Sequence, residues 1–322
     1  MHDQDELDPT RRTILRGLGA GLLVGGCTDP DGEADGGEST ATGSTGEMES
    51  SGNADESSSG STGGGGSGEN SSSTAAEDDT SSTGNPVDCD PADAWAAGGT
   101  AAMTAQDCYP DPFANGVDSC MLLCQTTAGP CTADTVDRQD VSEGYAGLPV
   151  RLALKIVNAD DCLPVEGAYV EIWHTQRAGI YSGMTPGGNV CNLGDQSAEA
   201  ELYFRGSRTT DAEGRVDFDT CYPGWYGGRA IHIHFRVMVD GNDHLVSQLF
   251  FDDALNDEIC TTHPDYAEFG APNTLNTTDG VIGDVADLSP YLLETARMAD
   301  GAMLASKVVA IRSSVDEPLC SA

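Results

Sequence analysis

The stretch YPGWYGGRAIHIHF, residues 222–235, is the most informative part of the sequence for both fold and chemistry. A Pro-Gly turn leads into IHIHFRVMV, residues 231–239, whose β-branched and aromatic residues predict a strand. Side chains two residues apart on a strand point to the same face, so His232 and His234 can present both imidazoles to one ion. The plain alternative is two histidines on a solvated strand face, but the residues that flank them are apolar.

Tyr226 lies just before this histidine pair. A phenolate ligand at this position would limit the metals that could bind there. An ion held by imidazoles and phenolates should be hard and highly charged, because it must lower a tyrosine pKa that is ordinarily about 10. Ferric iron meets this demand. The pattern therefore predicts a non-haem iron(III) site, and no Gly-rich dinucleotide motif accompanies it.

Several further segments have strand character and are separated by turn signals such as DAEG at 211–214. Besides residues 231–239, they are residues 148–157, 168–175, 215–218, 245–251 and 307–312. Repeated short strands without intervening helices predict an all-β fold, an antiparallel β-sandwich. One short C-terminal helix is expected at residues 290–298, with Ser289 as N-cap and Pro290 at the first helical position.

Over residues 118–315 the sequence resembles the intradiol ring-cleavage dioxygenases, which open catechols with non-haem iron(III), and it is most similar to an exported, lipoprotein-like branch. The stretches that carry the resemblance are Gly144 to Leu148, CLPVEGA (162–168), VEIWH (170–174), AGIYSG (178–183), FRG (204–206), Thr210-Asp211 with Gly214, Pro223 to Phe235, and Ser247-Gln248. The resemblance implies an antiparallel β-sandwich, in agreement with the strand pattern.

The resemblance also implies a role for each matching residue. Tyr181, Tyr226, His232 and His234 match the four iron ligands, with Tyr226 and His234 axial and a hydroxide completing the site. Arg229 matches an active-site arginine that stabilises negative charge on the substrate.

Gln248 matches a pocket residue that forms hydrogen bonds near the iron. The implied reaction is cleavage of a catechol-type aromatic by O2 to a cis,cis-muconate-type product, without an external reductant. In that reaction the catechol protons pass to the hydroxide and to Tyr226.

Three features depart from the family pattern or add to it. Cys131 stands where the family usually places an aromatic residue near the pocket, which leaves the pocket wall and the preferred catechol open. Residues 187–200 form a loop with an extra cysteine, and Glu171 and His174 are expected near the site without an assigned role. The chain also lacks the helical dimerisation segment of the cytosolic catechol enzymes, so the sequence predicts no oligomeric state.

The N-terminal region predicts export and attachment to a membrane. Arg11 and Arg12 precede an apolar run at 13–26 that ends in VGGC, typical of a lipoprotein signal cleaved before Cys27. We expect a signal at 1–27, lipid on Cys27, and location on the periplasmic side or the cell surface. The secretion route stays open between twin-arginine and general export. Residues 28–87 contain no Lys, Arg, Phe, Tyr or Trp and predict a disordered acidic linker, which leaves 88–322 as the catalytic domain.

Charge and cysteine content limit the other possibilities. The chain carries 53 acidic against 15 basic residues, a net charge of −38, which excludes nucleic acid as a partner. Ten cysteines follow Cys27, and behind an export signal they predict disulfides of unspecified pairing. A soft metal site at Cys120, Cys124 and Cys131 is a weaker alternative, because the paired C-x-x-C spacing is missing. For the whole chain, the alternative function is a non-catalytic, tethered binding module on the same sandwich.

Overall fold

A computed structural model describes residues 89–117 and 120–322, which form two four-stranded sheets. The expected signal, Cys27 and the whole of the expected linker lie outside the described residues. One sheet has the order β4-β1-β8-β7, and its strands are β1 (Pro149–Asn158), β4 (Arg215–Cys221), β7 (Glu294–Arg297) and β8 (Met303–Ile311). The other has the order β3-β2-β5-β6, and its strands are β2 (Tyr169–Trp173), β3 (Arg205–Thr209), β5 (His232–Val239) and β6 (Asn242–Phe250).

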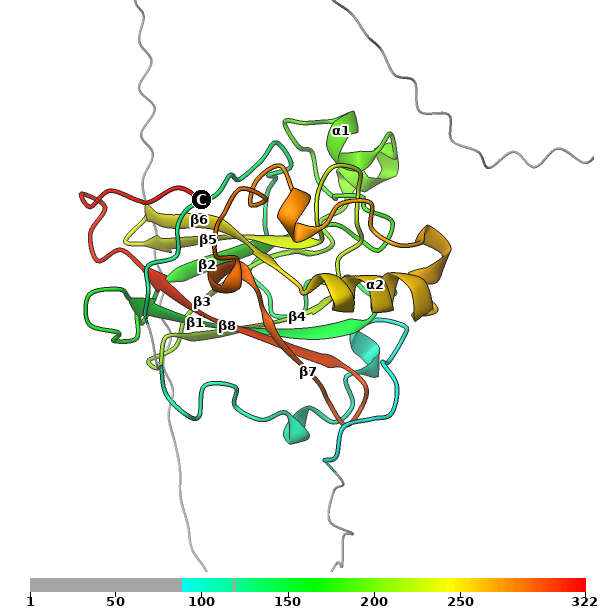
Figure 1. Ribbon diagram of the computed structural model, residues 1–322, viewed down its shortest axis with the longest axis horizontal. Coiled ribbons are helices and arrows are strands. Elements are labelled where there is room, and N and C mark those ends of the chain that lie inside the picture. Colours follow the sequence, from blue (N-terminus) through cyan, green and yellow to red (C-terminus); the bar gives the residue numbers. More distant parts are fainter. Residues whose placement is uncertain (1–88, 118–119) are drawn as a thin grey trace, which may run out of the picture. The chain divides into compact units, whose positions relative to one another are not determined.

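The two sheets pack face to face, with β1 and β8 in one layer and β5 and β6 in the other (Figure 1). Neighbouring strands are antiparallel except β1 and β8, which run parallel. The predicted β-sandwich is therefore confirmed, with this one parallel pair. Its core is built from alternate residues of each strand, such as Ile233, Phe235 and Val237 of β5, which are fully buried.

Helices are few and short in the described part of the chain. The α-helices are α1 (Asn189–Asn192) and α2 (Asp253–Thr262), and the 3-10 turns are Thr100–Ala102, Gln106–Cys108, Gln196–Ala200, Ala267–Phe269, Asn276–Thr278 and Ser289–Tyr291. Asp252 caps α2 by accepting hydrogen bonds from the N–H groups of Ala254 and Leu255. Among these helices none is long and apolar enough to cross a bilayer.

The helix expected at 290–298 forms only as the single 3-10 turn Ser289–Tyr291. The following residues, Glu294–Arg297, instead pair with β8 as the edge strand β7. Three of these four residues are exposed, so they carry no strand-like apolar alternation. Pairing with β8, which the sequence pattern does not show, decides their conformation.

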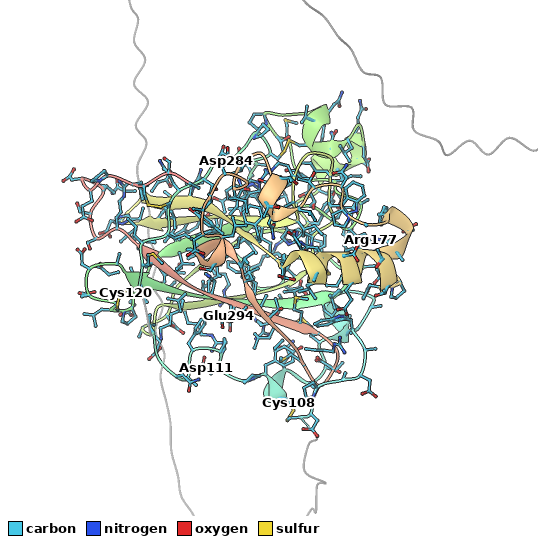
Figure 2. The ribbon with its side chains drawn as sticks, in the orientation of Figure 1. Cys108, Asp111, Cys120, Arg177, Asp284 and Glu294 are labelled. Atoms are coloured by element: carbon cyan, nitrogen blue, oxygen red, sulfur yellow. A yellow bond between two sulfur atoms is a disulfide. The ribbon has the colours of Figure 1, made fainter. Side chains whose placement is uncertain are left out.

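Four disulfides lie at different places around the domain, and Figure 2 marks two of their members, Cys108 and Cys120. The pairs are Cys89–Cys108, Cys120–Cys162, Cys124–Cys320 and Cys131–Cys191. The prediction of disulfides is confirmed for eight of the ten cysteines, whereas Cys221 and Cys260 are buried thiols. Cys120, Cys124 and Cys131 each have a different partner, so the alternative of a soft metal site at these three is wrong.

Candidate metal centre

Strand β5 places the two predicted histidines on the outer face of its sheet. Since Ile233 and Phe235 point into the core, His232 and His234 point away from it, and their Nε2 atoms lie 3.1 Å apart. Nδ1 of His232 is 2.6 Å from the Ala230 carbonyl oxygen, which can only accept a hydrogen bond. Nδ1 therefore carries the proton, and Nε2 of His232 offers a lone pair to the space in front of the strand.

The aromatic side chain of Trp173 covers the second histidine. Its ring stacks on His234 with 4.9 Å between centroids and 4° between planes. Trp173 is the residue directly opposite His234 in the β2–β5 register, so the pairing of the two strands sets this stack. The histidine face of β5 is consequently held by the sheet itself.

Both predicted tyrosines reach the same place from loops. The hydroxyl of Tyr181 lies 3.2 Å from Nε2 of His232, and the hydroxyl of Tyr226 lies 3.4 Å from that nitrogen. The two loops approach closely at Gly179, where a Cβ atom would stand 2.2 Å from the carbonyl oxygen of Trp225. Gly179 also has a φ of 76°, so a residue without a side chain is needed at this crossing.

These four donor atoms fit a single metal ion. Imidazole nitrogens bind zinc, for example, at about 2.0–2.1 Å, and two such bonds at a right angle place the donors about 3 Å apart. The separations of 3.1, 3.2 and 3.4 Å around His232 Nε2 agree with this spacing. In the described residues no three His, Cys, Asp or Glu side chains gather into a metal site, and the other two atoms around His232 Nε2 are the phenol oxygens of Tyr181 and Tyr226.

The electrostatics of the pocket favour a cation between the donors. Burial, together with the charge of Arg229, lowers the pKa of His232 to about 3, and burial also lowers the pKa of His234. Burial and the neighbouring Tyr226 raise the pKa of Tyr181 well above its usual value. Two neutral imidazoles therefore face each other with a buried phenol, and only a strongly charged ion would hold Tyr181 as phenolate.

Arg229 and Gln248, both predicted to be active-site residues, contact each other beside the four predicted metal ligands. Nη2 of Arg229 donates a hydrogen bond to Oε1 of Gln248. Nε2 of Gln248 donates to the carbonyl of Thr127 at 2.7 Å. Gln248 is opposite His234 in the β5–β6 register, which places it on the same face of the sheet. All six predicted site residues thus lie in one region.

Two residues without a predicted role belong to this region as well. Asp279 accepts a hydrogen bond from Nε of Arg229 at 2.8 Å. Arg205 is buried, donates to the carbonyls of Ser182 and Cys131 at 2.6 and 2.8 Å, and lies 6.0 Å from the centre of the Tyr181 ring. Burial lowers the pKa of Arg205 to about 10. The FRG motif could have drawn attention to Arg205, whereas no sequence signal marks Asp279.

Cys131 lies against the site through its disulfide with Cys191. Both cysteines pack with Trp173 and Tyr181, and the carbonyl of Cys191 accepts the backbone N–H of Tyr181 at 3.0 Å. The cysteine in place of the usual aromatic residue therefore serves as half of a cross-link beside Tyr181. The extra cysteine of the 187–200 loop is the other half.

Glu171 and His174 have partners of a structural kind. Glu171 pairs with Arg236 at 3.4 Å. His174 points into the core, where it stacks on Phe204 and lies 2.7 Å from the hydroxyl of Thr220. Glu171 lies in β2 and His174 directly follows it, so both are close in sequence to Trp173, although their side chains have these other partners.

Part of this chain is similar to known proteins. Residues 125–268 match the family described as Dioxygenase. Catechol 1,2-dioxygenase 1 of Acinetobacter lwoffii is 29% identical over 139 residues, which are 38% of this chain and 42% of that protein. Chlorocatechol 1,2-dioxygenase of Pseudomonas sp. (strain P51) is 29% identical over 114 residues, 30% of this chain and 41% of that protein. The match thus spans less than half the length of these curated relatives.

Among solved structures, an intradiol ring-cleavage dioxygenase from Tetranychus urticae is similar over most of the described domain. It is 26% identical, with a TM-score of 0.53, and the match covers 60% of this chain and 95% of that one. The alignment therefore takes in nearly the whole of that structure.

Proposed function

From the similarity of its β-sandwich domain to the intradiol ring-cleavage dioxygenase family, we propose that this protein is an iron(III) dioxygenase that opens the ring of catechol-type aromatics with O2. The observation that carries the proposal is the convergence of four donor atoms: the hydroxyls of Tyr181 and Tyr226 and Nε2 of His234 lie 3.1–3.4 Å from Nε2 of His232. The donor set has the hard, phenolate-rich character that suits ferric iron.

When bound, ferric iron would act as a Lewis acid that makes the bound catecholate reactive toward O2. Substrate approaches from the side of Tyr226 and Arg229, which are partly exposed, since Tyr181, His232 and His234 are buried. The oxygen of Tyr226 takes a proton from one catechol hydroxyl as the substrate binds. The product is a cis,cis-muconate-type diacid, and no external reductant is consumed.

Arg229 and Gln248 then act on the substrate side of the site. The guanidinium of Arg229 stabilises the negative charge that builds on the ring oxygens, because it is fixed in direction before the reaction begins. Gln248, held by the Thr127 carbonyl, keeps one end of that guanidinium in place. The indole of Trp173 and the buried ring of Tyr181 keep bulk water away from the reacting atoms.

The test is the visible absorption spectrum of the full chain loaded with iron, recorded before and after adding catechol without oxygen. A broad tyrosinate-to-iron(III) band that shifts with catechol, followed by ring opening once oxygen is admitted, is the expected result. A colourless protein that binds no iron would sink the dioxygenase proposal and leave the non-catalytic binding module.

We further propose that the enzyme acts outside the cytoplasm, attached to a membrane through lipid on Cys27. The four disulfides of the folded domain support this, because such bonds persist in oxidising compartments. Replacing Cys27 with serine should move the protein from the membrane fraction to the soluble fraction. Retention of this variant on the membrane would contradict the lipid anchor.

A further inference from the structure

The carboxylate of Asp279 is completely buried and uses both of its oxygens. Its side chain has 0% exposure. Oδ2 accepts from Nε of Arg229 and from the backbone N–H of Ala230, each at 2.8 Å. Oδ1 accepts from the N–H groups of Val281 and Ile282 in its own loop, at 2.8 and 3.3 Å. The side chain thus joins the loop after residues 276–278 to the segment that leads into β5.

This contact fixes the direction of the Arg229 side chain. An arginine side chain that is 16% exposed would otherwise keep much of its rotamer freedom. Here Nε is held by Asp279, and Nη2 is held by Gln248, whose amide is held in turn by the Thr127 carbonyl. The guanidinium is therefore held at two points, and Asp279 supplies the only carboxylate of this chain of contacts.

Electrostatics support a charged carboxylate at this position. Although burial raises the pKa of Asp279, the hydrogen bond and charge of Arg229 and the N–H of Ala230 outweigh it and hold that pKa below its usual value. The negative charge of Asp279 also compensates the cation of Arg229 inside the protein. Asp279 lies beyond residues 125–268, so the family match does not reach it.

We propose that Asp279 is a positioning residue for the ring-cleavage reaction, holding the Arg229 guanidinium toward the substrate. This inference rests on the proposed function. Arg229 acts on charge that develops after the catechol has bound, so misplacing it should lower kcat with little change in KM. A shift of about 1 Å in a reacting group costs on the order of 100-fold in rate.

The experiment compares Asp279→Asn, Arg229→Ala and the double variant in the iron-loaded full chain. Asp279→Asn should lower kcat about 100-fold. Iron content and the tyrosinate-to-iron(III) band before catechol is added should stay as in the wild type. Because Asp279 works through Arg229, the double variant should be no slower than Arg229→Ala alone.

The matched control is Asp219→Asn, which weakens another buried ion pair, that of Asp219 with Arg151. Arg151 and Asp219 pair across β1 and β4, in the sheet that does not carry the site, so this variant should lose stability and keep kcat. Should Asp279→Asn be poorly folded, Asp279→Glu is the second variant, because it keeps the charge but moves the carboxylate. Its kcat should fall about tenfold, and this loss should again vanish in the Arg229→Ala background.

If the loss of kcat in the double variant equals the product of the two single losses, the positioning role is overturned. The same holds if Asp279→Asn also lowers the iron content. Asp279 would then be a purely structural residue. A wild-type chain without an iron band or turnover would instead refute the proposed function, and with it the role of Asp279. The wild-type spectrum therefore separates the two failures.

Discussion

The two histidines and the two tyrosines of the proposed metal centre are held in place by different means. His232 and His234 belong to β5, which is paired on both sides, with β2 and β6. Tyr181 and Tyr226 lie on loops, where scattered hydrogen bonds and side-chain contacts take the place of a strand ladder. For Tyr181 these contacts include the hydrogen bond from its backbone N–H to the Cys191 carbonyl, the Cys131–Cys191 disulfide, and the hydrogen bonds that Arg205 donates to Ser182 and Cys131.

The difference shows which half of the site is redundantly supported. A strand flanked on both sides keeps its register when one contact is lost, because many ladder hydrogen bonds remain. The loop of Tyr181 has no such ladder, so loss of its cross-link or of Arg205 should shift it more than loss of one contact shifts β5. The loop that carries Tyr181 should consequently be the more sensitive part of the centre.

The largest effect is expected on the loop side, from Tyr226→Phe. The change removes the phenol oxygen, the proposed proton acceptor, but keeps the ring that packs beside Tyr181. Turnover should fall by at least about 100-fold, as for loss of a general acid–base group, with the fold retained. Product formation with catechol measures it.

A control for this variant is Tyr109→Phe, whose hydroxyl binds Asp300 away from the metal centre. It should leave turnover unchanged. Equal rates for wild type and Tyr226→Phe would mean that the assignment of Tyr226 as a ligand is wrong.

The next largest effect is expected from replacing both Cys131 and Cys191 with serine. This releases the loop that holds the backbone N–H of Tyr181. Iron affinity should fall by roughly 10- to 100-fold, the range for groups that orient a metal ligand. The free energy of unfolding should fall by about 3 kcal/mol. Competition with a chelator and urea unfolding measure the two quantities.

The matched control removes Cys89–Cys108, another disulfide of the same domain. Cys108 lies at the bottom of Figure 2, whereas α1, which contains Cys191, lies at the top. The stability cost should be similar, at about 3 kcal/mol, with iron affinity unchanged. Equal losses of affinity in both double variants would contradict a local role for Cys131–Cys191.

The strand side of this comparison is also the side that the sequence predicts. Period-two alternation places His232 and His234 on one face and the core residues on the other, and six of the eight strands follow from composition and turn signals. The two missed strands are polar or exposed: β3 is RGSRT, and β7 is ETAR. Their conformation comes from pairing with neighbours, which single-sequence patterns do not contain.

On the loop side, the sequence marks Tyr226 by its place just before the histidines, whereas Tyr181 is predicted only through resemblance to a family. Nothing in the spacing of Tyr181 or Asp279 shows that they approach β5, because loops bring them there. The sequence predicts disulfides without saying which cysteines pair, and it does not show that Cys221 and Cys260 are buried in the core as free thiols. The helix α2 was also missed, although Asp252 supplies an N-cap signal for it.

A smaller effect tests a third buried histidine, His174 at the end of β2. Burial lowers the pKa of His174 to about 4, whereas an unfolded chain binds a proton near pH 6.5. Between these values the unfolded state binds more protons, so stability falls as the pH drops from about 6.5 to 4. The contribution is about 3 kcal/mol across this range.

Urea unfolding of the wild type and of His174→Gln at pH 7 and pH 4.5 measures this contribution. The variant should be less stable at pH 7 but should lose less stability on acidification. Parallel pH dependence in the two proteins would show that His174 is not the group that takes up the proton.

The smallest effect is expected where the strand side and the loop side meet, at Arg205. This residue begins β3 and donates hydrogen bonds to the carbonyls of Ser182 and Cys131. Nη2 of Arg205 serves both carbonyls, and its Nε adds hydrogen bonds to the Ser182 carbonyl and hydroxyl. A lysine has no counterpart of Nε, so Arg205→Lys should lose these added hydrogen bonds at a cost of about 1–3 kcal/mol. Urea unfolding measures the loss.

Arg208→Lys, on the same strand but partly exposed and bonded to Gln139, is the control and should cost less. Iron affinity should fall in Arg205→Lys by less than in the double cysteine variant, because the disulfide still holds the loop of Tyr181. If it falls by more, the arginine rather than the cross-link fixes Tyr181. The sheet would then position the tyrosine as well as the histidines, and the two sides of the centre would depend on the same support.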